Sequence, residues 1–389
     1  MAKRKFELPG IQDLSKEQEA ARALPKEGQH LIIGGPGTGK SVLALIRSKR
    51  LQREGDDYLF LVYNHLLNNA SKQLFGGGFV SKTWTSWFWK AFREHTGRAV
   101  PRLPPNSNGY MEIDWAGALE TIYAMPGGAT QEGLPFLVID EGQDMPREFY
   151  EALVNLGFDR FFVVADQNQQ ITERNSSRED IRTHLAIESN EVIELKRNYR
   201  NNLSVAKLAH AFYTGDPASP PPELPSTSSG TVPVLYAYDQ DKLMNVAQGI
   251  LLLADRDPRQ LIGVLTPSNL VRKAYLNALS STTAKLDIPR ASINTFSSTQ
   301  RPKVAFDEGG ILVINAQSCK GLEFDTVILA DIDKHFFNPS DPDKTKRLFY
   351  VMVARARERV FMFKKQSGRS EIEKILPTDS SILRREQVR

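Results

Sequence analysis

The sequence has little cysteine, little net charge and no long apolar run. Its single cysteine, Cys319, cannot form a disulfide within the chain, which favours a reducing compartment. No apolar stretch approaches the roughly 20 residues that a membrane-spanning helix needs. The basic N-terminus lacks the apolar core of a signal peptide. These absences predict a cytoplasmic protein without a membrane partner.

The composition is that of a folded globular protein. The 389 residues are 41% hydrophobic and 25% charged, and this length suffices for two domains that each bury a core. The 50 Lys and Arg residues exceed the 46 Asp and Glu residues only slightly, giving a net charge of +4. This balance permits a nucleic-acid partner but does not require one.

Short apolar runs alternate with helical patterns along the chain. Strands are expected at Leu31–Ile33, Tyr58–Tyr63, Phe136–Ile139, Phe161–Val164, Val232–Tyr236, Ile262–Leu265, Ile311–Ile314, Thr326–Leu329 and Val360–Phe363. Helices are expected at Lys40–Gln52, His65–Leu74, Val205–Phe212, Lys242–Leu253, Asn269–Leu279 and Thr345–Arg357. Continuous apolar strands separated by helices predict an α/β fold with parallel sheets that are covered on both faces.

This pattern divides into two lobes, with a boundary near Ser189–Leu195. We expect a first lobe over residues 1–190, with a small helical insert around 90–134, and a second lobe over 191–389. The Pro- and Ser-rich stretch Gly215–Gly230 is expected to be a surface loop, because proline interrupts regular structure.

The most informative motif is GGPGTGKS, Gly34 to Ser41, which follows an apolar run and precedes a helical pattern. Glycines allow backbone N–H groups to surround phosphate oxygens at the start of a helix. The pattern predicts that Gly35, Pro36, Gly37, Thr38 and Gly39 form the loop, with Lys40 on the β- and γ-phosphates and Ser41 on Mg²⁺. The expected ligands are ATP and Mg²⁺.

A second motif, FLVIDEGQD, ends an apolar strand with two carboxylates. The carboxyl edge of a parallel sheet is where ligands bind in such folds. Asp140 is expected to hold Mg²⁺ beside Ser41, and Glu141 to orient and deprotonate a water molecule. An acidic pair after a strand can also cap a helix, but its combination with a phosphate-binding loop favours nucleotide hydrolysis.

The order and wording of these and further motifs resemble the UvrD/Rep group of superfamily 1 helicases, motors that move on single-stranded DNA. The matching segments are LSKEQEAA, VYNHLLNNASKQL, TWTSWF, VVADQNQQI, LKRNYRN, IGVLTPSN, NAQSCKGLEFDTVIL and RLFYVMVARARERV. The resemblance implies two tandem RecA-like P-loop NTPase lobes, helicase activity with 3′ to 5′ movement, and a site between the lobes.

The resemblance also implies roles for single residues. It assigns Gln18 to the adenine edge, Tyr199 to stacking on adenine, and Gly321 and Glu323 to the nucleotide, with Glu323 near the ribose. It assigns Arg200 and Arg355 to the γ-phosphate, and Gln169 to coupling between the γ-phosphate and nucleic acid. Candidate nucleic-acid contacts are Asn64, Thr83, Trp84, Trp87 and Gln317, the last at a position where the family often has His.

Two departures from the family pattern bear on function. No aromatic residue follows Gln169 closely, so stacking on bases would have to come from residues such as Trp84 and Trp87. The four-residue spacing of Trp84 and Phe88 equally suits packing in a core. The chain also has no room for the large accessory insert that family members generally carry in the second lobe.

Two functions follow from these observations. The first is an ATP-driven helicase or translocase on single-stranded nucleic acid, DNA rather than RNA by family likeness. The second is an ATP-gated subunit that recruits or licenses a protein partner such as a nuclease, without unwinding by itself. A small-molecule kinase has no need for the motifs of the second lobe.

Overall fold

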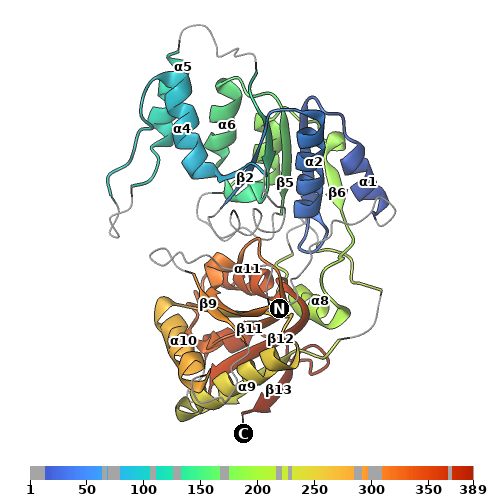
Figure 1. Cartoon of the computed structure of the whole chain (residues 1–389), viewed down its shortest axis with the longest axis vertical. Coiled ribbons are helices and arrows are strands. Elements are labelled where there is room, and N and C mark those ends of the chain that lie inside the picture. Colours follow the sequence, from blue (N-terminus) through green and yellow to red (C-terminus); the bar gives the residue numbers. More distant parts are fainter. Residues whose placement is uncertain are drawn as a thin grey trace.

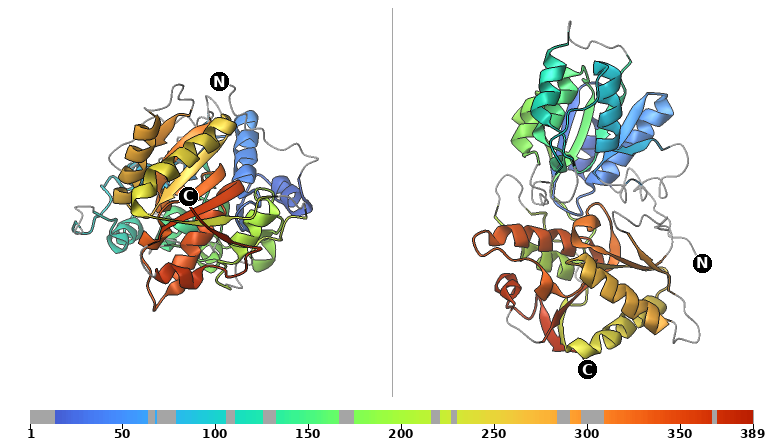
Figure 2. Two further views of the ribbon diagram at one scale, coloured as in Figure 1. Left: turned by 90° about the horizontal axis from the view of Figure 1, so that it is seen from below. Right: turned by 90° about the vertical axis from the view of Figure 1, so that its left-hand side faces the viewer.

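The structure is a computed structural model of the whole chain, in which two α/β lobes are stacked one above the other (Figure 1). Figure 2 shows the same two lobes from below and from the side. The residues that the structure describes are 14–63, 68, 79–105, 111–125, 133–166, 175–215, 221–226, 230–283, 291–296, 309–366 and 370–388.

The first lobe is built on a parallel sheet whose described strands have the order β3-β2-β4-β5-β1-β6. These strands are β1 (Gln29–Gly34), β2 (Tyr58–Val62), β3 (Ser81–Thr83), β4 (Phe136–Ile139), β5 (Phe161–Ala165) and β6 (Ile193–Leu195). Every residue of β2, β4 and β5 is buried, as expected for strands covered on both faces.

Helices cover both faces of this sheet. They are α1 (Lys16–Ala23) and α2 (Lys40–Glu54) on one face, and α4 (Trp84–Thr96), α5 (Trp115–Tyr123), α6 (Arg147–Asn155) and α7 (Arg178–His184) on the other. Successive side chains of a strand point to opposite faces, so Leu31 and Ile33 pack with α4 to α7, whereas Ile32 packs with α1 and α2. The core of the lobe therefore lies in two layers.

The second lobe repeats this arrangement with the strand order β13-β7-β12-β11-β8-β10-β9, all parallel. Its strands are β7 (Val234–Tyr238), β8 (Leu261–Thr266), β9 (Ile293–Thr295), β10 (Gly310–Asn315), β11 (Phe324–Leu329), β12 (Ala356–Lys365) and β13 (Arg384–Gln387). Helices α8 (Leu203–His210) and α11 (Pro342–Val353) cover one face, and α9 (Leu243–Arg256) and α10 (Asn269–Thr283) cover the other. The short 3-10 helices are η2 (Gly142–Asp144), η4 (Ser189–Glu191), η5 (Gln240–Lys242), η6 (Ala316–Cys319), η7 (Ile332–Lys334) and η8 (Glu371–Ile375).

The prediction of two α/β lobes with parallel sheets is confirmed. Each apolar run expected to be a strand is one, although β7 lies two residues later than the expected range. The expected helix Thr345–Arg357 is wrong at its end, because α11 stops at Val353 and β12 begins at Ala356. Strands β3, β6, β9 and β13 were not expected, because a segment of three or four residues without a clear apolar run is too short to be recognised as a strand from its sequence.

The first sheet ends within the boundary region expected near Ser189–Leu195. Strand β6 pairs with β1 through Ile193 and Ile32, so the first sheet continues beyond residue 190 to Leu195. The helices that lie around 90–134, α4 and α5, pack into the core of the first lobe. The expected helix His65–Leu74 lies outside the described residues except for residue 68, and so does much of Gly215–Gly230.

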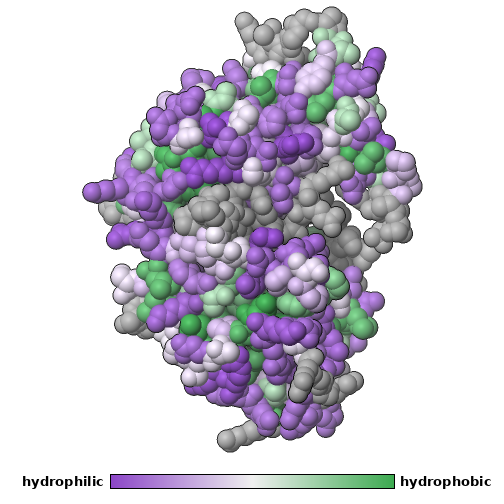
Figure 3. All heavy atoms as spheres, turned by 180° about the vertical axis from the view of Figure 1, so that it is seen from behind, coloured by the Kyte–Doolittle hydropathy of each residue, from purple (hydrophilic) through white to green (hydrophobic). Residues whose placement is uncertain are grey.

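The face of the molecule opposite to that of Figure 1 is mostly polar. On the face seen from behind, hydrophobic side chains are scattered among hydrophilic ones (Figure 3). No helix in the described ranges combines the length and the apolar character that crossing a membrane requires. Cys319, the one cysteine, is fully buried in the second lobe, as expected for a small core residue.

Candidate nucleotide site between the lobes

The Gly-rich segment Gly34–Ser41 joins the end of β1 to the start of α2. Gly37 and Gly39 have φ angles of 80° and 89°, in the left-handed region that favours glycine. No side chain caps the first turn of α2, so its N–H groups can bind an anion. The strand, loop and helix have the order that a phosphate-binding loop requires.

The segment that connects the lobes, between β6 and α8, and the stretch around Pro222, which follows α8, both lie directly against this loop. A Cβ atom on Gly37 would lie 2.2 Å from Oδ1 of Asn198, and one on Gly35 would lie 2.4 Å from Cγ of Pro222. The N–H of Tyr199 donates to the carbonyl oxygen of Gly37 at 2.8 Å. Close packing, and not only the turn, therefore requires glycine at both positions.

Lys40 is held by oxygen atoms of the protein. Its Nζ donates to the carbonyl oxygens of Gly34 at 2.6 Å and Gly35 at 2.8 Å. It also lies 3.4 Å from Oδ2 of Asp166, a fully buried carboxylate that follows β5. Phosphate oxygens at the loop would replace these partners, so the lysine is already placed at the expected anion site.

Asp140 and Glu141 follow β4 and are both buried. The pKa of Asp140 is raised to about 7, first by burial and then by the adjacent charge of Glu141, while a hydrogen bond with the Ser41 hydroxyl opposes the rise. The structure thus brings together Ser41 and Asp140, the two residues expected to hold Mg²⁺. Two neighbouring carboxylates away from water favour a bound cation, so these residues fit the metal.

Glu141 faces an arginine of the other lobe. Burial by itself would raise the pKa of Glu141, but the charges of Arg355, then Lys40 and Lys320, lower it below its usual value. Nη2 of Arg355 lies 3.9 Å from Oε1 of Glu141, and Gln143 donates to Oε2 at 2.7 Å. Glu141 is therefore held as a carboxylate, the form that accepts a proton.

Gln143 connects the two halves of the site. Its Oε1 accepts from the N–H of Asp166 at 2.9 Å, while its amide donates to Glu141. A chain of contacts therefore runs from Lys40 through Asp166, Gln143 and Glu141 to Arg355. A change at the phosphate-binding loop can reach the second lobe along this chain.

A second ion pair joins the lobes beside the first. Nζ of Lys320, which follows η6, lies 2.5 Å from Oδ1 of Asp144, the last residue of η2. Both side chains are almost fully buried. Gly321, next to Lys320, has a φ angle of 73°, so it turns the chain back towards β11.

Arg200 and Glu323 contact each other. Nε of Arg200 donates to Oε1 of Glu323 at 2.9 Å, and the Arg200 Nη2 approaches the same oxygen. Burial would raise the pKa of Glu323, but the charge of Arg200 lowers it overall. The expectation placed these side chains at the γ-phosphate and near the ribose, and in this structure they are partners.

Comparison with known proteins bears on the second lobe. Residues 310–363 match the family model of the UvrD-like helicase C-terminal domain. This segment of the second lobe is similar to a UvrD-like helicase C-terminal domain. The resemblance to the UvrD/Rep group is confirmed for this segment, which contains both Lys320 and Arg355.

Two further comparisons accompany this match. One solved structure, the C-terminal domain of a possible DNA helicase from Lactobacillus plantarum WCFS1, is similar at 14% identity with a TM-score of 0.35. The alignment covers 48% of this chain and 97% of that one. No curated protein sequence matches the chain.

The candidate nucleic-acid contacts differ in where the structure places them. Trp84 and Trp87 are 7% and 8% exposed and pack in the core of the first lobe, against Phe149 and Phe158 respectively. The prediction that these indoles stack on bases is wrong for this structure, and the core-packing alternative is correct. Thr83 is also buried, at the N-cap of α4.

The remaining candidates are exposed or lie outside the described residues. Gln317 is exposed in η6, beyond the carboxyl end of β10. Asn64 and Gln169 lie outside the described residues. Tyr199 keeps its side chain 49% exposed beside the phosphate-binding loop.

Gln18 has a second task that sequence reasoning missed. Its side chain completes a capping box with Ser15, and its Nε2 donates to the carbonyl oxygen of Thr38 at 2.9 Å. The hydroxyl of Thr38 in turn donates to the carbonyl oxygen of Gly35 at 2.8 Å. Gln18 thus supports the phosphate-binding loop from α1.

Sequence reasoning also missed Gln143, Asp144, Asp166 and Lys320. All four stand inside motifs quoted for other residues, and all are buried polar groups. Lys320 and Asp144 are 176 residues apart, and no local pattern shows that they meet.

Proposed function

We propose that the chain is an ATP-driven motor that translocates on single-stranded DNA in the 3′ to 5′ direction. The position of Arg355 carries this proposal. Its guanidinium belongs to the second lobe and lies 3.9 Å from Glu141 of the first lobe, next to the phosphate-binding loop. ATP at this loop would contact both lobes and favour their closure.

In the proposed reaction, water attacks the γ-phosphorus, its proton passes to Glu141, and the bridging oxygen leaves with ADP. Lys40 binds the β- and γ-phosphates, and Arg355 stabilises the charge that develops on the γ-phosphate oxygens. Ser41 and Asp140 would hold Mg²⁺, which neutralises part of the phosphate charge when bound. Loss of the γ-phosphate contacts lets the lobes reopen, and a track held differently in the two states turns this cycle into movement.

ATP hydrolysis by the purified chain tests the proposal directly. Steady-state rates would be measured without polymer, with single-stranded DNA and with single-stranded RNA, and the Glu141→Gln variant would serve as the blank. Stimulation by DNA above that by RNA is expected. A rate that neither polymer changes would refute the motor.

A second function, an ATP-gated subunit that licenses a partner such as a nuclease, is favoured by one observation. Trp84 and Trp87, the aromatic residues expected to stack on bases, are buried. Such stacking contributes about 1–3 kcal/mol per base in single-strand binders. The isolated chain should then fail to displace streptavidin from either end of a biotinylated oligonucleotide, whereas the motor displaces it from the 5′ end.

A further inference from the structure

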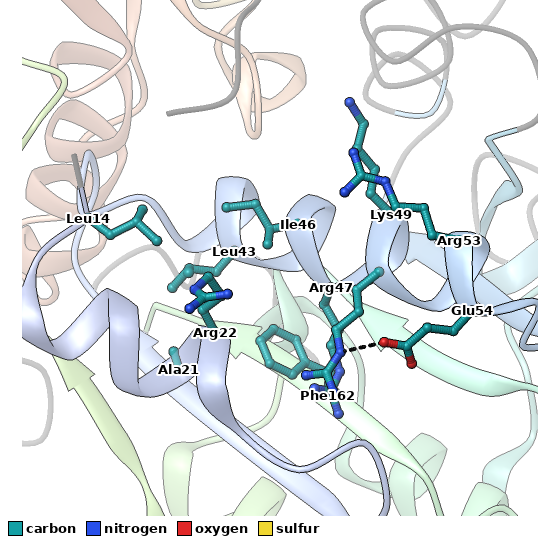
Figure 4. Close-up of a pocket in the computed structure, with 11 residues that line it drawn as sticks. Leu14, Ala21, Arg22, Leu43, Ile46, Arg47, Lys49, Arg53, Glu54 and Phe162 are labelled. Carbon is teal, nitrogen blue, oxygen red and sulfur yellow. Dashed lines mark hydrogen bonds and ion pairs between the residues drawn. The ribbon is translucent and has the colours of Figure 1, made fainter. Parts of the chain in front are cut away.

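A groove runs between α1 and α2 on the face of the first lobe that these helices cover (Figure 4). Its volume is about 450 Å³, within the range of about 300–1,000 Å³ that ligand pockets occupy. The lining of α2 extends from Leu43 to Glu54, which corresponds to about 16 Å of helix. The groove is therefore long enough for about three turns of a second helix.

The floor of the groove is apolar. Leu14 precedes α1, Leu43 and Ile46 come from α2, and Phe162 comes from β5 (Figure 4). Leu43 and Phe162 belong to the core, while Leu14 and Ile46 are half-buried. Apolar side chains of a ligand could extend this core outward.

The sides of the groove are basic. Its cationic lining residues are Arg22, Arg47, Lys49, Arg50 and Arg53, and Glu54 is the one acidic residue in the described lining. Arg22 and Arg50 each lie beside an acidic residue. Arg22 pairs with Glu19 at 2.6 Å, and Arg50 pairs with Glu54 at 3.0 Å. Positive charge still exceeds negative charge along the groove.

Arg47 is the most buried cation of the lining and keeps one donor without an acceptor in the described part of the chain. It is 3% exposed, and its guanidinium lies 5.0 Å from the ring centre of Phe136 and 5.4 Å from that of Phe162. It donates to backbone carbonyl oxygens, among them those of Leu24 and Lys26. Its Nε has no acceptor among the described residues. A buried donor without an acceptor invites one from a ligand.

We propose that this groove binds an acidic amphipathic helix of a partner protein. Apolar residues of that helix would lie on Leu14 and Ile46, the half-buried residues of the floor, and its carboxylates would accept from Arg53 on the side of the groove. This is the helix-in-groove mode of recognition with charge complementarity added. The surface is distinct from the nucleotide site, and the proposal does not depend on ATP hydrolysis.

The chemistry of the groove disfavours two other occupants. A single nucleic-acid strand needs accessible aromatic faces as well as cations, and the aromatic ring in the described lining, Phe162, is buried beneath Arg47. The first 13 residues of the chain carry Lys3, Arg4 and Lys5 against two acids, so their charge has the same sign as that of the groove.

Fluorescence anisotropy of the full chain tests the proposal. The probes are labelled helical peptides of about 18 residues with Leu at positions i, i+3, i+4 and i+7 and Glu on the flanks, each with a scrambled control. Micromolar binding that weakens as salt rises is expected. The variants Arg53→Glu and Ile46→Ser should each weaken it about tenfold or more.

Lys90→Glu is the matched control, because Lys90 is an exposed cation on α4, which covers the opposite face of the sheet. This variant should bind the peptides as the unchanged chain does, and thermal melts would confirm that all variants fold. Absence of peptide binding up to about 1 mM would overturn the proposal. So would labelled oligothymidylate that binds more tightly than the peptides and loses affinity in Arg53→Glu.

Discussion

Nζ of Lys320 lies 2.5 Å from Oδ1 of Asp144, and this ion pair joins the two lobes where both side chains are almost fully buried. Arg355 and Glu141 form a second, longer contact across the same interface. Charges that are buried in this way are costly unless they are paired. Each of these buried charges therefore depends on its partner in the other lobe.

Removal of one member of the buried pair should destabilise the protein strongly. Burial raises the pKa of Asp144 to about 6, and the charge of Lys320 opposes this rise. In Lys320→Met the buried Asp144 loses its partner and must either stay charged or take up a proton, which should cost about 3–5 kcal/mol of unfolding free energy in urea denaturation at pH 7. The double variant with Asp144→Leu should recover most of this loss. Lys90→Met, which removes an exposed pair on α4, should change stability little, and an equal effect of both lysine variants would contradict the interpretation.

Substitution of Gly37 by alanine should strain the backbone of the phosphate-binding loop and also disturb the residues packed against it. Gly37 and Gly55 have nearly the same φ, 80° and 79°, but a Cβ on Gly37 would meet Asn198 and Arg200, whereas one on Gly55 would meet nothing within 4 Å. Gly55→Ala should therefore cost only about 1 kcal/mol of unfolding free energy. Gly37→Ala should cost more and should also weaken nucleotide binding, measured with a fluorescent ATP analogue. Equal stability of the two variants would show that the segment with Asn198 and Arg200 does not constrain the phosphate-binding loop.

Arg355 should affect the rate of hydrolysis more than the binding of nucleotide. In the proposed reaction its charge acts on the γ-phosphate as negative charge accumulates there, so Arg355→Met should lower kcat by about 10³-fold or more. Binding of a non-hydrolysable analogue should change only a few-fold. Arg357→Met, an exposed arginine two residues away, is the control and should retain the original kcat. A large rise in KM with unchanged kcat would place Arg355 in binding alone.

His335 should make the second lobe sensitive to acid. Burial lowers its pKa to about 4, its Nε2 has no partner among the described residues, and its ring packs on Phe349. The imidazole of His335 binds a proton near pH 6.5 in the unfolded chain and only near pH 4 in the folded one. The stability that neutral His335 contributes is therefore complete above about pH 6.5. It should fall by up to about 3 kcal/mol as the pH drops to 4. Denaturation between pH 4 and 7 should show a weaker pH dependence for His335→Phe, and an unchanged slope would exclude His335 as its source.

Much of the fold could be predicted from local pattern. Apolar runs such as Phe136–Ile139 and Phe161–Val164 indicate buried parallel strands, because both of their faces are covered. The position of Trp84 and Trp87 could not be decided in the same way. A tryptophan at helical spacing can pack in a core or lie on a surface that stacks on bases, and the sequence pattern is the same in both cases. Only the contacts of the two indoles with Phe149 and Phe158 distinguish the core position from the surface position.

By itself, the sequence determined the chemical groups beside three strands: the Gly-rich loop after β1, the carboxylates after β4 and the arginine before β12. These features are local, since strand, turn and helix depend on neighbouring residues. The pairing of Lys320 with Asp144, of Arg200 with Glu323, and of Arg47 with backbone carbonyls was decided by the tertiary structure alone. Such pairs join segments with no common pattern, and burial, which makes each charge need its partner, exists only once the lobes have packed.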